Sequence, residues 1–152
     1  MHHFPETTAF ALAFLWSIIS ASASAQTQAK VECPQPRFTG SAPADYLSRT
    51  NPLASNADEL AAGQVLYANN AHGAACTACH GMRGDAKAPL SSMFTPPPRN
   101  FACSKTISEI ADGQLFWIIR FGSPGTAMPP HPALSDDDIW RLVFHLRRLA
   151  SN

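Results

Sequence analysis

Cys76-Thr77-Ala78-Cys79-His80 is the stretch of this 152-residue chain that decides its fold. The pattern C-x-x-C-H is typical of a site where haem is attached covalently. Each thiol can add across one haem vinyl group, and the two-residue spacing lets both sulfurs act from one helical turn. His80 can then ligate the iron. A zinc site would need a second ligand pair, which the isolated Cys33 and Cys103 do not form, and a redox-active dithiol is the remaining alternative. The motif predicts one covalent haem c.

The first 25 residues resemble an export signal. The apolar run 10–19 is too short to span a bilayer, and Ala23-Ser24-Ala25 is a small-x-small cleavage pattern. The preceding segment has no Lys or Arg, so an uncleaved anchor is the alternative. We expect export to the periplasm, an oxidising compartment that suits both haem attachment and a disulfide. Membrane association is expected only if the signal segment is retained.

The charge balance gives no sign of a polyanionic partner. The chain has 11 basic and 11 acidic residues, and loss of residues 1–25 would remove one acid, Glu6. Two haem propionates would then bring the net charge to about −1. Neither nucleic acid nor an anionic membrane surface is expected as a partner.

The segment 26–54 is polar and interrupted by four prolines, so we expect an irregular extension without a helical period. Its Cys33 and the later Cys103 are the cysteines left once haem is attached. In an exported chain a Cys33–Cys103 disulfide would tie the extension to the domain, while free thiols or an intermolecular bridge are the alternatives. We therefore expect a signal peptide at 1–25, an irregular Pro-rich extension at 26–54 and one domain at 55–152.

Three further segments are predicted to be helical. The first begins at the S-x-x-D pattern 55–58 and ends before Gly73, and the second runs from an N-cap at Asp112 to a C-cap at Gly122. The third begins at the S-x-x-D pattern 135–138 and has an apolar face over 139–149. Residues 91–105, which contain three consecutive prolines, are expected to form a loop.

This order of features resembles a class I c-type cytochrome, over roughly residues 57–149. The order is an N-terminal helix, C-x-x-C-H, a proline, a methionine loop and a C-terminal helix. The stretch 112–130 is similar to small bacterial periplasmic monohaem cytochromes. The resemblance implies an all-α cytochrome c fold. In it the N- and C-terminal helices pack across each other around one covalently bound haem, with the irregular extension added.

The resemblance also assigns roles to individual residues. Gly63 and Tyr67 of the first helix would pack against the last helix, with Trp140, Val143 and Phe144 as candidates there. The carbonyl of Pro89 would accept the N–H of the haem-ligating His80. Met128, in the Pro-containing loop, would be the second axial ligand of the iron.

Other residues are weaker candidates for the haem. Trp117 and Arg120 are candidates for hydrogen bonds to the propionates, with a core aromatic and a solvated charge as the alternatives. Met82 lies too near the haem-binding turn to reach the other face. Met93 and His131 remain possible substitutes for Met128, whereas His72 and His145 are expected at the surface or at an interface.

Iron with both axial positions filled leaves no open position for a substrate, and no other catalytic constellation is evident. The expected function is therefore one-electron transfer between a redox protein donor and an acceptor, without catalysis. The first alternative is the electron-accepting cytochrome subunit of a periplasmic dehydrogenase or another redox complex. A haem ligand sensor or peroxidase-like enzyme is the alternative from another class, and it requires Met128 to leave the iron.

Overall fold

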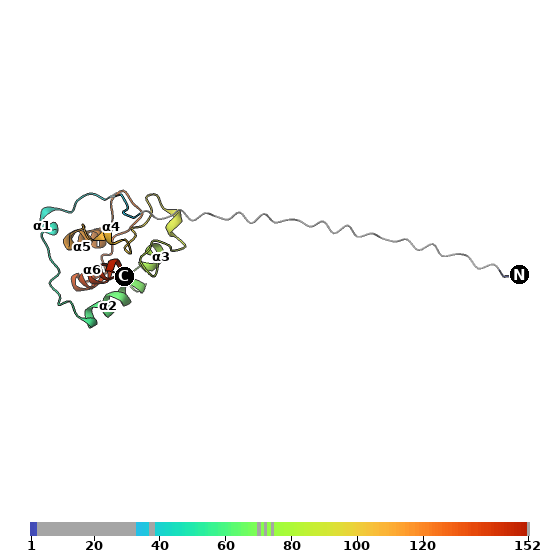
Figure 1. Cartoon of the computed structure of the whole chain (residues 1–152), viewed down its shortest axis with the longest axis horizontal. Coiled ribbons are helices and arrows are strands. Elements are labelled where there is room, and N and C mark those ends of the chain that lie inside the picture. Colours follow the sequence, from blue (N-terminus) through green and yellow to red (C-terminus); the bar gives the residue numbers. More distant parts are fainter. Residues whose placement is uncertain (3–32, 37–38, 70, 72, 74, 152) are drawn as a thin grey trace.

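The computed structural model describes residues 1–2, 33–36, 39–69, 71, 73 and 75–151 (Figure 1). The predicted export signal beyond its second residue, the start of the extension and His72 lie outside these ranges. The described residues form helices and loops and contain no strand. The elements are α1 Ala44–Leu47, α2 Ala57–Ala68, α3 Thr77–His80, the 3₁₀ turn η1 Ser91–Met93, α4 Ser104–Ile107, α5 Asp112–Phe121 and α6 Asp136–Ser151. The all-α prediction is thus confirmed.

Helix α6 is the centre of the packing, since it contacts α2, α4 and α5 (Figure 1). It crosses α2 at Gly63, where an added Cβ would lie 2.2 Å from the Arg141 carbonyl oxygen. Such a close approach of two backbones requires glycine. An ion pair of 2.6 Å between Arg141 and Glu59 spans the same crossing. The predicted crossing of the two helices is present. The sequence did not indicate that the backbone of Arg141 would be the partner of Gly63.

The aromatic partners at this crossing differ from the prediction. Tyr67 packs against the His145 ring, with ring centroids 4.9 Å apart. Trp140 instead packs against Phe116 of α5, at 4.6 Å. Residues 141 and 145 lie on the face of α6 that meets α2, whereas residue 140 lies on a different face. Trp140 therefore cannot take the position beside Tyr67.

Local capping explains where the helices begin. Ser135 and Asp138 form the reciprocal capping box that the sequence predicts for α6. In α2 the cap is Asn56 rather than Ser55, since the Asn56 side chain accepts the Glu59 N–H. Asp112 is the first residue of α5 rather than its N-cap, and its carboxylate pairs with Arg147 of α6 at 2.6 Å.

The core is one apolar cluster between the long helices and the haem-motif segment. It is formed by Tyr67, Phe101, Ile107, Leu115, Phe116, Ile119, Leu134, Ile139, Trp140, Leu142, Val143 and Leu146. Most of these residues come from α5 and α6, whose apolar faces meet each other. This cluster supports the wall of the cavity described below.

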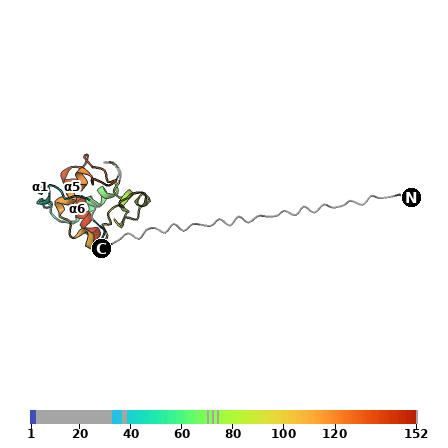
Figure 2. The ribbon, with the colours of Figure 1, turned by 90° about the horizontal axis from the view of Figure 1, so that it is seen from above.

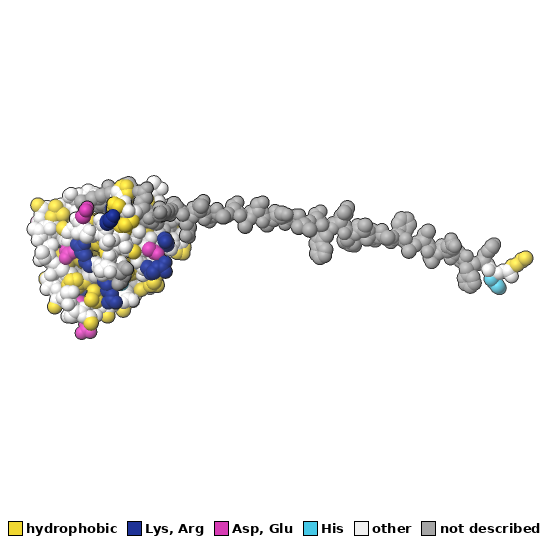
Figure 3. Space-filling model, in the orientation of Figure 1, with side chains coloured by type: hydrophobic (Ala, Val, Ile, Leu, Met, Phe, Trp, Pro, Cys, Tyr) yellow, Lys and Arg dark blue, Asp and Glu magenta, His cyan; other side chains and the backbone are white. Residues whose placement is uncertain are grey.

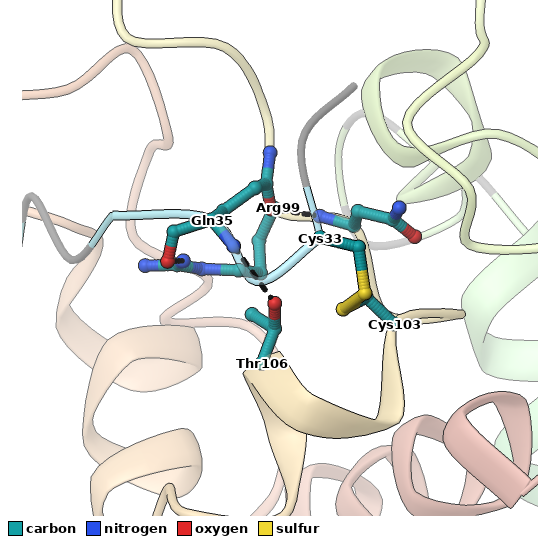
Figure 4. The surroundings of a disulfide bond; sticks show 6 residues. Cys33, Gln35, Arg99, Cys103 and Thr106 are labelled. Atoms are coloured by element: carbon teal, nitrogen blue, oxygen red, sulfur yellow. Dashed lines mark hydrogen bonds between the residues drawn. A yellow bond between two sulfur atoms is a disulfide. The ribbon is translucent and has the colours of Figure 1, made fainter. Parts of the chain in front are cut away.

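The described residues of the extension, 33–36 and 39–54, lie on the domain. Residues 44–47 form the short helix α1, contrary to the prediction that the extension has no helix, and α1 packs against α5 (Figure 2). The Pro43 carbonyl accepts hydrogen bonds from the N–H groups of Tyr46 and Leu47, which accounts for this turn. Upstream, the structure joins Cys33 to Cys103 in a disulfide with a Cα–Cα distance of 5.7 Å, close to the usual spacing (Figure 4).

The surface carries charges of both signs. Basic and acidic side chains are both present on the face shown in Figure 3, as the equal numbers of basic and acidic residues suggest. None of the helices in the described ranges has the length and apolar character needed to cross a membrane.

Candidate haem site

The haem motif forms a single helical turn. Cys76 precedes α3, and Cys79 and His80 are its last residues. The turn ends at Gly81, whose φ of +80° lies in the left-handed region that favours glycine. The carbonyl of Cys79 accepts a 2.6 Å hydrogen bond from Ser91 Oγ. The two thiols and the imidazole are therefore presented from one short, fixed element.

His80 is buried and held in one tautomer. Its Nδ1 lies 3.0 Å from the Arg99 carbonyl oxygen. Since a carbonyl only accepts, Nδ1 must carry the proton, and the lone pair of Nε2 is left available for a metal. Burial lowers the pKa of His80 to about 4, so the imidazole is neutral at physiological pH. The Phe101 ring stacks on it at 4.4 Å.

The predicted role of Pro89 is wrong. Arg99, not Pro89, supplies the carbonyl that accepts the His80 N–H, and Pro89 is exposed. The physical reason is the length of the intervening loop. After His80 the chain turns through Gly81–Ala86, forms η1, and returns to the imidazole only after the three prolines.

An apolar cavity lies beside the haem motif and receives Met128. Cys76, Cys79 and His80 line it together with side chains from α5, α6 and the methionine loop, among them Leu115, Ile119, Met128, His131, Leu142 and Leu146. Met82 and Met93 are each 71% exposed and do not line it. Met128 is therefore the methionine that the fold brings to the site, while Met82 and Met93 are kept away from it.

The predictions for Arg120 and Trp117 are not supported. The Arg120 guanidinium donates to the Leu134 carbonyl and pairs with Asp136, so it holds the start of α6 instead of facing the cavity. Trp117 packs against Phe121 and is not part of the cavity lining. Both side chains lie on the side of α5 opposite Leu115 and Ile119, a face that the sequence pattern alone did not identify.

The residues present fit a covalent haem. Cys76 and Cys79 are free, and burial raises the pKa of Cys76 to about 11 and also raises that of Cys79. Both are therefore thiols at physiological pH. The walls are mainly apolar, and a neutral histidine and a thioether are available as ligands. Within the described residues there is no cluster of three or more His, Cys, Asp or Glu side chains able to hold a metal ion by themselves.

Arg99, Gln35 and Thr39 also line the cavity and were not predicted from the sequence. Arg99 follows the proline run, and Gln35 and Thr39 come from the extension, about forty residues before the motif. Nothing in a linear pattern brings the extension to the cavity. The available signal was Cys33, because a tether at that position restricts where Gln35 can lie.

The helical architecture, the C-x-x-C-H turn and the apolar cavity together define a class I c-type cytochrome. A profile of the family described as "Cytochrome C oxidase, cbb3-type, subunit III" matches residues 58–146, and the chain belongs to this family of c-type cytochromes. A cytochrome c domain transfers electrons and carries haem as its cofactor. A search of curated protein sequences finds no match.

Two solved structures are similar to this chain. One, from the Kuenenia stuttgartiensis reducing HAO-like protein complex Kustc0457/Kustc0458, has a TM-score of 0.55 and 24% identity over 68% of this chain and 48% of that chain. The other, cytochrome CL of the marine methylotroph Methylophaga aminisulfidivorans, has a TM-score of 0.45 and 22% identity over 62% of this chain and 57% of that chain. This chain thus spans about half the length of each. The first supports the fold.

Proposed function

We propose that the protein is a periplasmic one-electron carrier with a single haem c, attached through Cys76 and Cys79 and ligated by His80 and Met128. One observation carries this proposal. The buried His80, with Nε2 available, lines the same apolar cavity as the two thiols and Met128. When bound, the haem supplies an iron that cycles between ferrous and ferric states, and thioether ligation favours the ferrous form.

The protein's own residues would keep the geometry constant during electron transfer. The Arg99 carbonyl fixes the His80 ring, which raises its basicity toward iron. The methionine loop is held by two hydrogen bonds, from Ser123 N to the Met128 carbonyl and from Met128 N to Thr126 Oγ1. The mainly apolar walls would limit the access of water. A site held in this way changes little between redox states, which suits a carrier with a protein donor and a protein acceptor.

The proposed organisation is a signal peptide at 1–25, the extension at 26–54 and the cytochrome domain at 55–152. It includes the Cys33–Cys103 disulfide, which an oxidising compartment would maintain. The 5.7 Å Cα spacing supports that pairing.

The test is spectroscopic and compares two methionine variants. The exported protein should gain the mass of one haem under denaturing conditions and show a low-spin spectrum with the weak long-wavelength ferric band of methionine–iron ligation. Met128→Ala should abolish that band and let the reduced protein bind carbon monoxide, because a coordination position opens. Met93→Ala, a change at an exposed methionine outside the cavity, is the matched control and should alter neither property.

Three outcomes would contradict the proposal. They are the absence of covalent haem, a high-spin wild-type spectrum, and a band that survives Met128→Ala. A high-spin wild type that binds carbon monoxide would favour the ligand sensor or peroxidase-like alternative.

A fixed subunit of a larger redox complex is the second candidate. Large apolar side chains, those of Met82, Leu90 and Met93, are exposed on the segment that follows the haem motif. Such a surface suits a lasting interface, and one structurally similar chain comes from a complex. Co-purification of the tagged protein with a larger enzyme from its own cells would favour this candidate. A monomer that exchanges electrons with several partners would favour the free carrier.

A further inference from the structure

Two described segments of the extension, 33–36 and 39–42, contribute residues to the lining of the cavity. We call residues 33–36 and 39–42 the strap. Gln35 and Thr39 of the strap line the cavity, and the Cys33–Cys103 disulfide fixes one end of it beside α4 (Figure 4). The strap is therefore a wall of the proposed haem site, although it lies far from the haem motif in the sequence.

Gln35 forms hydrogen bonds through its backbone N–H and through the oxygen and the nitrogen of its side-chain amide. Its N–H donates to Thr106 Oγ1 at 3.0 Å (Figure 4). Its Nε2 donates to the Pro98 carbonyl at 3.1 Å, and its Oε1 accepts from Asn100 N at 2.6 Å. The two side-chain bonds join the strap to Pro98 and Asn100, the residues on either side of Arg99.

Arg99 links the strap to the proposed iron ligand His80. Its guanidinium donates to the carbonyls of Gln35 and Pro36, at 3.3 and 3.1 Å. Its own carbonyl accepts from His80 Nδ1. One residue thus holds the strap with its side chain and orients the imidazole with its backbone.

The other end of the strap reaches the methionine loop. Thr39 Oγ1 and Ser123 Oγ are 2.5 Å apart, and Ser123 N donates to the Met128 carbonyl. Gln114 of α5 fixes this end, since its Oε1 accepts from Ala42 N and its Nε2 donates to the Gly40 carbonyl. The strap is therefore connected both to the residue that orients His80 and to the loop that carries Met128.

We propose that the strap is a clasp that completes the haem pocket and keeps external ligands from the iron. It holds His80 through Arg99 and the Met128 loop through Ser123, and the disulfide tethers it. This inference depends on the proposed haem site. The physical basis is that a tethered segment reforms its hydrogen bonds at high effective concentration, whereas an untethered one can leave.

The experiment measures carbon monoxide binding to the reduced haem protein. The variants are Cys33→Ser/Cys103→Ser, which removes the tether, Arg99→Gln, and Thr39→Val, which keeps the disulfide. In wild type Met128 fills the coordination position, so carbon monoxide should bind only very slowly, as Met128 leaves the iron. Each of these variants should bind it about tenfold faster, the scale expected for the loss of residues that support a metal ligand. Arg83→Gln is the matched control, because Arg83 is exposed and pairs with Asp85 instead of the strap.

A second measurement distinguishes a loss of His80 positioning from a general loosening of the fold. In the reduced protein the His80 Nδ1 proton should exchange with solvent faster in Arg99→Gln than in Arg83→Gln. Only Arg99→Gln removes the guanidinium that ties to the strap the residue whose backbone carbonyl accepts this proton. Thr39→Val decides the matter if the cysteine variant fails to fold, since it removes one hydroxyl and leaves the tether intact.

The outcomes distinguish this inference from the proposed function. A wild type with the methionine–iron band, combined with variants whose carbon monoxide binding and proton exchange match Arg83→Gln, overturns the clasp alone. A wild type without covalent haem overturns both. Faster binding in the cysteine variant, in Arg99→Gln and in Thr39→Val, with wild-type behaviour in Arg83→Gln, establishes the clasp.

Discussion

His145 is a histidine buried without a polar partner in the described structure. Its side chain is 6% exposed, and neither ring nitrogen forms a hydrogen bond there. It packs between the Tyr67 ring and the Gly63 backbone of α2. Burial, and then the nearby Arg148 charge, lower its pKa. The fold therefore holds the imidazole neutral, since a charged one would have no counterion in this interface.

His145 should make stability depend on pH. Its folded-state pKa lies below the unfolded value of about 6.5, so the unfolded state binds more protons between the two values. The stability is fully present above pH of about 6.5 and is lost as the pH falls through the folded-state pKa. His145→Phe should flatten this fall, by at most about 1.4 kcal/mol per pH unit. Urea unfolding of both haem proteins across this range measures the difference, and parallel curves would refute the prediction.

The α2–α6 crossing shows how one position can set the distance between two elements. Helix propensity alone favours alanine at Gly63 by about 1 kcal/mol. The Arg141 carbonyl, 2.2 Å from an added Cβ, reverses that preference because backbone cannot move aside as a side chain can. The contact therefore fixes how closely α6 approaches α2.

Gly63→Ala should lower the free energy of unfolding by about 1–3 kcal/mol, the usual cost of overpacking. Gly40→Ala is the matched control, because an added Cβ there meets nothing within 4 Å. Denaturant unfolding of both variants measures the comparison. Equal stability of the two variants would show that the crossing can relax at little cost.

The structural features that were predicted correctly from the sequence are those determined by residues close together in the chain. The Ser135 capping box and the Gly122 helix end depend on neighbours a few residues away, and both are present. The prediction that the Pro89 carbonyl accepts the His80 N–H was wrong, because the acceptor depends on where a long loop returns to the imidazole. The structure gives no support for the roles of Arg120 and Trp117, since the sequence does not say which face of α5 lines the cavity. The strap could not be predicted, since its contacts join residues more than sixty positions apart.

At the scale of the whole molecule, the disulfide joins residues 70 positions apart. A cross-link acts mainly by reducing the conformational freedom of the unfolded chain, and the effect grows slowly with loop length. The extension adds few core residues, since the main apolar cluster begins at Tyr67. The stabilising effect expected of the tether is therefore largely entropic.

Cys33→Ser/Cys103→Ser should lower the free energy of unfolding by about 4 kcal/mol, the value that the chain-entropy relation gives for such a loop. Equilibrium unfolding of the oxidised haem protein measures it, with the wild type treated with a thiol reductant as a parallel sample. A loss below about 1 kcal/mol in both samples would show that the bridge does not constrain the unfolded chain.

The Cys33–Cys103 bridge also divides the chain topologically. It closes a ring that contains the whole C-x-x-C-H turn and His80, whereas Met128 lies in the open C-terminal segment beyond it. A partial opening that detaches the C-terminal segment can therefore proceed without breaking the ring. The two proposed iron ligands would then differ in permanence: Met128 should be lost first under partial unfolding, while His80 stays within the covalently closed loop.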